Sequence, residues 1–196
     1  MRVSLRQRGL ALEYATLGWN VVGFGVMAIT AWRAGSIALA GFGLDSLIEI
    51  FASVVVIWQL MDNTRGREPL ALRLIGGAFF LLAVYLPLQS AVAWSSGARP
   101  APSRVGMIWL LATVVAMLLL AWGKLSVGRA LGNAVLIAES RVTLIDAALA
   151  MAVLLGIGLN ALFGWWWSDP LAGLVIVIYA IAEGRAAWRV QSCVSS

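Results

Sequence analysis

Long apolar stretches separated by short polar segments dominate the chain. A membrane-spanning helix needs about 20 mostly apolar residues, and six stretches meet this requirement. They are residues 11–32, 36–60, 71–94, 105–123, 134–163 and 170–188. The pattern therefore predicts an all-α membrane protein, a six-transmembrane-helix bundle formed by one transmembrane domain over residues 1–196.

The polar breaks between these stretches predict short connections. Residues 62–69 form a polar turn, and residues 95–103 contain glycine and two prolines, as loops do. Residues 123–133 are expected to be a short basic linker. Asp169 before Pro170 fits an N-cap followed by proline at the first helical position, so we expect a structural role for this acid.

The composition excludes a soluble domain. Hydrophobic residues make up 62% of the chain and charged residues 12%, whereas soluble domains hold about 45–50% and about 25%. The first apolar stretch is too long for a cleavable signal peptide and lacks a small-residue cleavage site. We therefore expect an integral, multi-pass protein, most simply of a bacterial inner membrane.

The basic residues predict the orientation of the chain. One set of connections and both termini hold Arg2, Arg6, Arg8, Arg65, Arg67, Arg73, Lys124, Arg129, Arg185 and Arg189. The opposite side holds Arg33, Arg99 and Arg104. Cytoplasmic segments are enriched in lysine and arginine, so both termini are expected to be cytoplasmic. The net charge of +5 then reports topology and does not indicate a nucleic-acid partner.

Asp45 and Glu49 carry the strongest chemical signal. They lie four residues apart in the second stretch, so both carboxylates fall on one face of a helix. Asp45 lies about 13 Å into the span, near the middle of a bilayer. Isolated anions at this depth are costly and repel each other. The pair is expected to face a wet cavity, bind cations or hold protons, which are all features of a transport pathway.

The fifth stretch supplies a third acid. Glu139, Val142 and Asp146 share one helical face by their spacing. Asp146 is expected to lie deepest, whereas Glu139 is either an anion at the mouth of the pathway or a surface group. Thr143 is either a ligand or bonded to its own backbone.

Other polar residues complete this picture. Glu13 and Asn20 in the first stretch could line the same cavity, although Glu13 is more simply placed at the cytoplasmic end near Arg8. Arg141 is the one basic residue expected at membrane depth. With no histidine and with Cys193 alone in the tail, a metal site here must use oxygen ligands. Such ligands suit Zn²⁺, Mn²⁺ and Mg²⁺.

Two segments together resemble the cation diffusion facilitator family. Residues 35–49 are similar to its second span, where two acids four apart bind metal, and residues 139–146 with 164–172 resemble its fifth and sixth spans. The resemblance implies a homodimer that exports divalent metal from the cytosol in exchange for protons. It also implies that Asp45, Glu49 and Asp146 are metal ligands.

The chain departs from the family pattern in two places. Val142 stands where the family often has a histidine four residues before the aspartate, so water, Thr143 or Glu139 would complete the ligand shell. The chain also ends soon after the sixth stretch, as in a short branch of the family without the cytoplasmic C-terminal domain. The contacts of a homodimer would then come from the membrane helices.

The sequence therefore predicts a zinc/proton antiporter that works by alternating access, with Zn²⁺ as the transported ion and Mn²⁺ or another divalent cation as alternatives. Two other functions stay open: a non-transporting membrane subunit with a degenerate metal site, and a small-molecule/proton antiporter. An enzyme is not expected, because the spans show no pair of nucleophile and base.

Overall fold

Five long helices make up most of the structure, which is a computed structural model. It describes residues 2–61, 68–96, 103–165, 167–168, 171, 177–178, 181–182 and 185. The helices are α1 (Arg2–Ala34), α2 (Ile37–Met61), α3 (Glu68–Ser96), α4 (Arg104–Leu131) and α5 (Ala134–Phe163). The predicted cap at Asp169 and, apart from a few isolated positions, the predicted sixth span lie outside the described residues. Over the rest of the chain the all-α prediction is confirmed.

The first helix begins well before the apolar stretch that predicted it. The arginine-rich segment from Arg2 continues the helix, and the Arg6 side chain donates from Nε to the carbonyl oxygen of Leu60 over 2.6 Å. An arginine that binds the last carbonyl groups of a neighbouring helix satisfies acceptors that the helix itself leaves unpaired. The polar start of α1 thus fixes the end of α2.

The predicted linker at residues 123–133 is wrong. Helix α4 runs through it to Leu131, and its glycines are packing positions: a Cβ on Gly123 would meet Leu12, and one on Gly128 would meet Ile137. Glycine lets two helices approach closely in a membrane. The helix ends instead at Gly132, where the backbone turns into the left-handed region at φ 64°.

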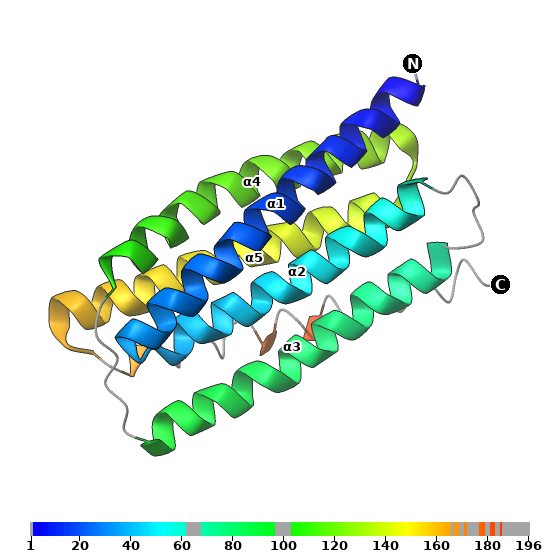
Figure 1. The fold of residues 1–196 in the computed structure, drawn as a ribbon. Coiled ribbons are helices and arrows are strands. Elements are labelled where there is room, and N and C mark those ends of the chain that lie inside the picture. Colours follow the sequence, from blue (N-terminus) through cyan, green and yellow to red (C-terminus); the bar gives the residue numbers. More distant parts are fainter. Residues whose placement is uncertain are drawn as a thin grey trace.

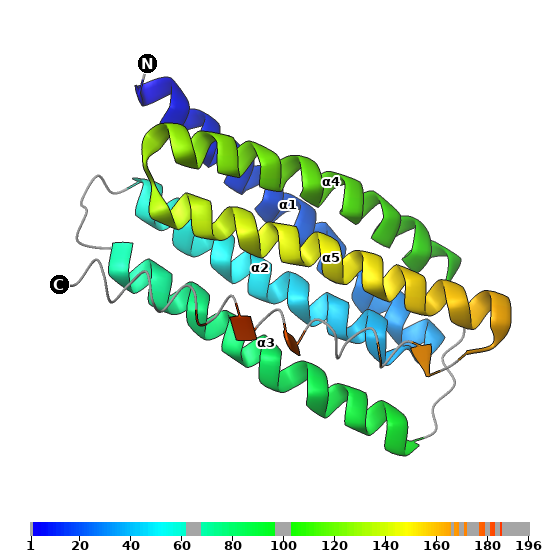
Figure 2. The same ribbon diagram turned by 180° about the vertical axis from the view of Figure 1, so that it is seen from behind.

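Four helices form a ring. α1 packs against α2 and α4, and α5 packs against the same two helices, so that each member touches two neighbours. Figures 1 and 2 show α3 outside this ring, along α2. The first residues of α1, the last of α2 and the α4–α5 turn share one end, called below the N-terminal end of the bundle (Figure 1). The interior of the ring is where the four helices direct their buried side chains.

The outer surface of the ring is apolar. Four helices in the described part of the chain, α1, α2, α4 and α5, are long and apolar enough to cross a membrane. Large apolar side chains are exposed on all four, including Val22, Leu47, Leu119 and Leu155. An outward apolar surface around a polar interior is the reverse of a soluble bundle. This chain is therefore an integral membrane protein.

A two-residue turn, Gly132 and Asn133, joins α4 to α5. Gly132 has a positive φ and Asn133 accepts the Leu136 N–H on its side-chain oxygen over 2.8 Å, which caps the start of α5. Glycine adopts positive φ freely, whereas an L-residue with a Cβ does so at a cost. No neighbouring atom lies within 4 Å of a Cβ built on Gly132, so the conformational cost would stand alone.

Gly132→Ala is therefore expected to lower the free energy of unfolding by roughly 1–2 kcal/mol, the cost of a left-handed residue with a Cβ. Gly158→Ala is the matched control, because Gly158 lies inside α5 and also has no atom within 4 Å of an added Cβ. In a helix interior, alanine should stabilise by about 0.5–1 kcal/mol. Thermal unfolding in detergent measures both changes, and equal behaviour of the two variants would contradict the assignment.

Candidate cation site inside the helix bundle

The interior of the ring holds far more negative than positive charge. Of the nine acidic residues in the chain, five are buried in the described residues: Glu13, Asp45, Glu49, Glu139 and Asp146. Lys124 is the one buried basic residue over the same part of the chain. Burying a charge without a partner is strongly unfavourable. This interior must therefore be neutralised by protons or by bound cations.

Asp45 and Asp146 form the centre of the cluster. α2 and α5 bring them into the same part of the ring interior, where their carboxyl groups interact with each other. Both side chains are buried, and Asp45 Oδ2 and both oxygens of Asp146 have no hydrogen-bond donor in the described part of the chain. Two carboxylates this close require a shared proton or a cation between them.

Glu49 lies one turn from Asp45, on the side of the N-terminal end. It is buried, both of its oxygens lack a hydrogen-bond partner among the described residues, and it interacts electrostatically with Asp146, Glu139 and Lys124. In the described part of the chain, no three acids lie close enough together to hold a metal ion. The structure therefore joins Asp45 to Asp146 and leaves Glu49 between this pair and a second group.

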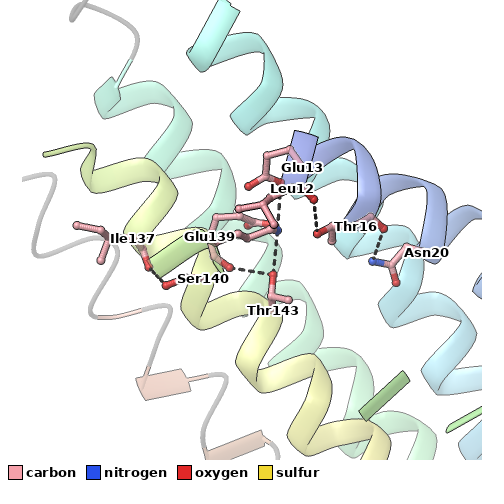
Figure 3. Close-up of polar contacts among 9 residues, drawn as sticks. Leu12, Glu13, Thr16, Asn20, Ile137, Glu139, Ser140 and Thr143 are labelled. Carbon is pink, nitrogen blue, oxygen red and sulfur yellow. Dashed lines mark hydrogen bonds and ion pairs between the residues drawn. The ribbon is translucent and has the colours of Figure 1, made fainter. Parts of the chain in front are cut away.

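That second group surrounds Lys124. Its ammonium group donates to Glu139 Oε1 over 2.9 Å and to Thr143 Oγ1 over 3.0 Å, and lies 3.1 Å from Glu13 Oε2. Lys124, Glu13 and Glu139 are each 0% exposed. Figure 3 shows Glu13 on α1 facing Glu139 and Thr143 on α5, with the ion pair between them. The group ties α1, α4 and α5 together.

Several expectations for individual residues change here. Glu13 lies in the interior of the ring, which was the alternative to a place near Arg8, and Glu139 is not a surface group, because both bind a buried lysine. Arg141 is exposed and is not the basic residue of the interior. Thr143 is bonded to its own backbone, because it donates to the Glu139 carbonyl over 3.1 Å, and it also accepts from Lys124.

Asn20 lies inside the ring, as expected. It is buried, and its side-chain amide donates to the Thr16 carbonyl of the preceding turn over 3.2 Å (Figure 3). Val142 is buried on the same side of α5 as Thr143 and Asp146, and its apolar side chain offers no ligand. The family that the chain resembles often has a histidine at this position, whereas here the position holds a side chain that only packs.

Lys124 is the residue that sequence reasoning missed. It was placed in a linker because Gly123 precedes it and Arg129 follows. A usable signal lies in the spacing of the buried positions Leu110, Thr113, Met117, Ala121, Lys124 and Gly128. Steps of three and four residues keep one helical face inward. This spacing continues through Lys124 and predicts that the lysine points into the bundle.

The chain is similar to known proteins of cation efflux. Residues 66–189, more than half of the chain, match the profile of the cation efflux transmembrane domain. A cadmium, cobalt and zinc/H(+)-K(+) antiporter of Bacillus subtilis (strain 168) is 27% identical over 170 residues. The match covers 81% of this chain and 54% of that relative, so the chain spans about half the relative's length.

Proposed function

Because this chain belongs to the cation efflux family, also called the cation diffusion facilitators, we propose that it transports divalent metal cations through the helix ring. The cation would bind at the buried acids, and alternating access would expose the site first to one side of the membrane and then to the other. Zn²⁺ is the proposed cargo and protons are the proposed counter-ion.

The buried charge carries this proposal. Among the described residues, five acids and one lysine occupy the interior of a ring with an apolar outer surface. Ionisable residues at membrane depth are costly and mark pathways for ions or protons. A packing role alone would favour equal numbers of acids and bases, because unpaired buried charges destabilise the folded state.

Asp45 and Asp146 are the residues proposed to receive the ion. Their carboxyl groups interact, and Asp45 Oδ2 and both oxygens of Asp146 are unpartnered in the described residues. Glu49 would be the third acidic ligand, joining when the ion draws its carboxylate toward the pair. The Val142 side chain has no atom that can bind a metal ion, so a water molecule would fill the remaining coordination position.

The same acids provide the exchange with protons. Carboxylates must be deprotonated to bind a metal, so metal binding releases protons and protons compete with metal. The Bacillus relative is named as an antiporter of cadmium, cobalt and zinc with protons and potassium. Oxygen ligands hold Zn²⁺ at about 2.0–2.2 Å and also accept Mn²⁺. Zn²⁺ is therefore the first cargo to test, followed by Cd²⁺, Co²⁺ and Mn²⁺.

The remaining features of the proposal concern the assembly. We propose six spans with both termini in the cytosol, a single transmembrane domain, a bacterial cell membrane and a homodimer formed by membrane helices. The basic termini support the orientation. The N-terminal end of the bundle would then face the cytosol, and the site would load from that side.

Transport can be tested in proteoliposomes that contain a trapped zinc-sensitive dye. Zn²⁺ uptake is expected to rise several-fold when the lumen is more acidic than the medium, because outward proton movement then drives the exchange. The measurement is the initial rate of dye fluorescence with and without the gradient. An uncoupler that collapses the gradient serves as the control.

Each outcome of this test selects one function. Zn²⁺ flux that follows the proton gradient supports the antiporter. Zn²⁺ binding to purified protein without any flux selects the non-transporting subunit. If the protein neither binds nor transports the four metals but moves an organic cation in exchange for protons, the small-molecule antiporter is selected. That result would overturn the proposal.

A further inference from the structure

The ammonium group of Lys124 is held as a bound cation would be. It donates to Glu139 Oε1 at 2.9 Å and to Thr143 Oγ1 at 3.0 Å, and it forms an ion pair with Glu13 Oε2 at 3.1 Å. These oxygens come from α1 and α5, whose side chains face each other in Figure 3. Two helices thus build an oxygen cage, and a third helix supplies the cation that fills it.

The charge in this cage is not balanced. Two carboxylates face one ammonium group, so one negative charge is left over when both acids are ionised. Glu13 Oε1 and Glu139 Oε2 have no hydrogen-bond partner in the described part of the chain, although both side chains are 0% exposed. A buried oxygen without a partner carries a large desolvation cost. A divalent cation would match the two carboxylates better than the lysine does.

The cage lies on the way to the Asp45–Asp146 pair. Glu139 is near the α4–α5 turn, and Asp146 lies seven residues further along α5, about 10 Å deeper by the helical rise. Glu49 lies one turn of α2 from Asp45 toward the N-terminal end of the bundle, and it interacts electrostatically with Glu139, Glu13 and Asp146. Acidic oxygens therefore continue from the cage to the pair.

From these observations we propose that Glu13, Glu139 and Thr143 form a second divalent-cation site, and that Lys124 is a tethered cation which occupies it when metal is not bound. A metal ion that enters from the N-terminal end displaces the ammonium group. The ion then passes Glu49 on its way to Asp45 and Asp146. Lysine suits this role because its ammonium is a compact charge on a flexible four-carbon stem. The inference deepens the proposed function, on which its transport role rests.

Removal of the tethered cation should expose the second site to metal. Purified Lys124→Met, freed of metal and equilibrated with Zn²⁺, is expected to bind about one more ion per chain than the unmodified protein, because two deprotonated acids and a hydroxyl are then available. Elemental analysis after equilibrium dialysis gives the count. Arg129→Met is the matched control, since Arg129 is an exposed basic residue of the same helix. It should leave the count unchanged.

The two proposals can be separated in the Asp45→Asn/Asp146→Asn background, which removes the deeper site. There, Lys124→Met should still bind the additional ion, and a further Glu13→Gln change should abolish that binding. A folded Lys124→Met that binds no more Zn²⁺ than the unmodified protein overturns the second site and makes Lys124 a structural brace. If the unmodified protein binds no Zn²⁺, that result would instead count against the Asp45–Asp146 assignment.

Lys124→Gln provides the same test with an amide in place of the ammonium group. The amide keeps a hydrogen-bond donor for Glu13 or Glu139 and removes the charge, so this variant is easier to fold than Lys124→Met. It should also gain the additional ion. Equal Zn²⁺ counts for Lys124→Gln and the unmodified protein would contradict the proposal independently.

Discussion

Asp45→Asn and Asp146→Asn are each expected to lower Zn²⁺ transport by at least about 100-fold, because residues that merely support a ligand already cost 10–100-fold in metal affinity when mutated. Asparagine keeps the shape of aspartate and removes its charge. The two aspartates meet across the ring, so the loss of either one removes half of the central pair. Initial rates of Zn²⁺ uptake in proteoliposomes measure the change.

Ser46→Ala is the control for these variants. Ser46 is buried on α2 next to Asp45, but its hydroxyl group donates to the Phe42 carbonyl of its own helix over 3.2 Å. Removal of this hydroxyl group changes the same segment of α2 without taking an oxygen from the aspartate pair. The rate of Zn²⁺ transport should therefore stay within about twofold of the unmodified protein, which corresponds to roughly 0.5 kcal/mol. Near-normal transport by Asp146→Asn, with the protein folded, would remove the pair from the pathway.

Lys124→Met is expected to destabilise the metal-free protein by about 3–5 kcal/mol, the usual cost of removing one partner of a buried ion pair. Its ammonium group is 0% exposed and contacts two carboxylates and a hydroxyl. Methionine fills a similar volume but leaves Glu13 and Glu139 facing each other without a cation. Thermal unfolding in detergent with a chelator present measures the loss.

Two comparisons make this prediction specific. The triple variant Glu13→Gln/Lys124→Met/Glu139→Gln should recover most of the lost stability, because a buried ion group can often be replaced by neutral residues without cost. The free energy of unfolding of Arg129→Met should lie within about 0.5 kcal/mol of that of the unmodified protein, as is usual for substitutions at exposed positions. If Lys124→Met also unfolds within that range, the buried ion group does not stabilise the ring.

The sequence predicted the bounds of a ring helix well where residues next to its ends cap the helix. The expected fifth span, 134–163, has the same bounds as α5, because Asn133 caps its start and Gly164 adopts a positive φ at its end. The predicted fourth span ends at residue 123, whereas α4 continues to Leu131 and Gly123 lies at a helix contact. Glycine has both uses, and the neighbouring helix decides between them.

The acids of the central pair were also predicted from local rules. Asp45 and Glu49 lie on one buried face of α2, and Asp146 lies inward on its own helix. Spacing along a helix did not show that Asp45 would meet Asp146 while Glu49 stayed apart. That outcome depends on how far α2 and α5 are shifted along each other, which no single helix encodes.

The sequence by itself determined that this chain forms apolar membrane helices with acids on their inner faces, because helix periodicity and the cost of charge in a bilayer act within each segment. Only the tertiary structure decided the partners. It placed Lys124 of α4 between Glu13 of α1 and Glu139 of α5, residues separated by up to 126 positions. The physical reason is that a buried charge is stabilised by whichever group the packing of the helices brings within about 4 Å, and that packing is a property of the whole ring.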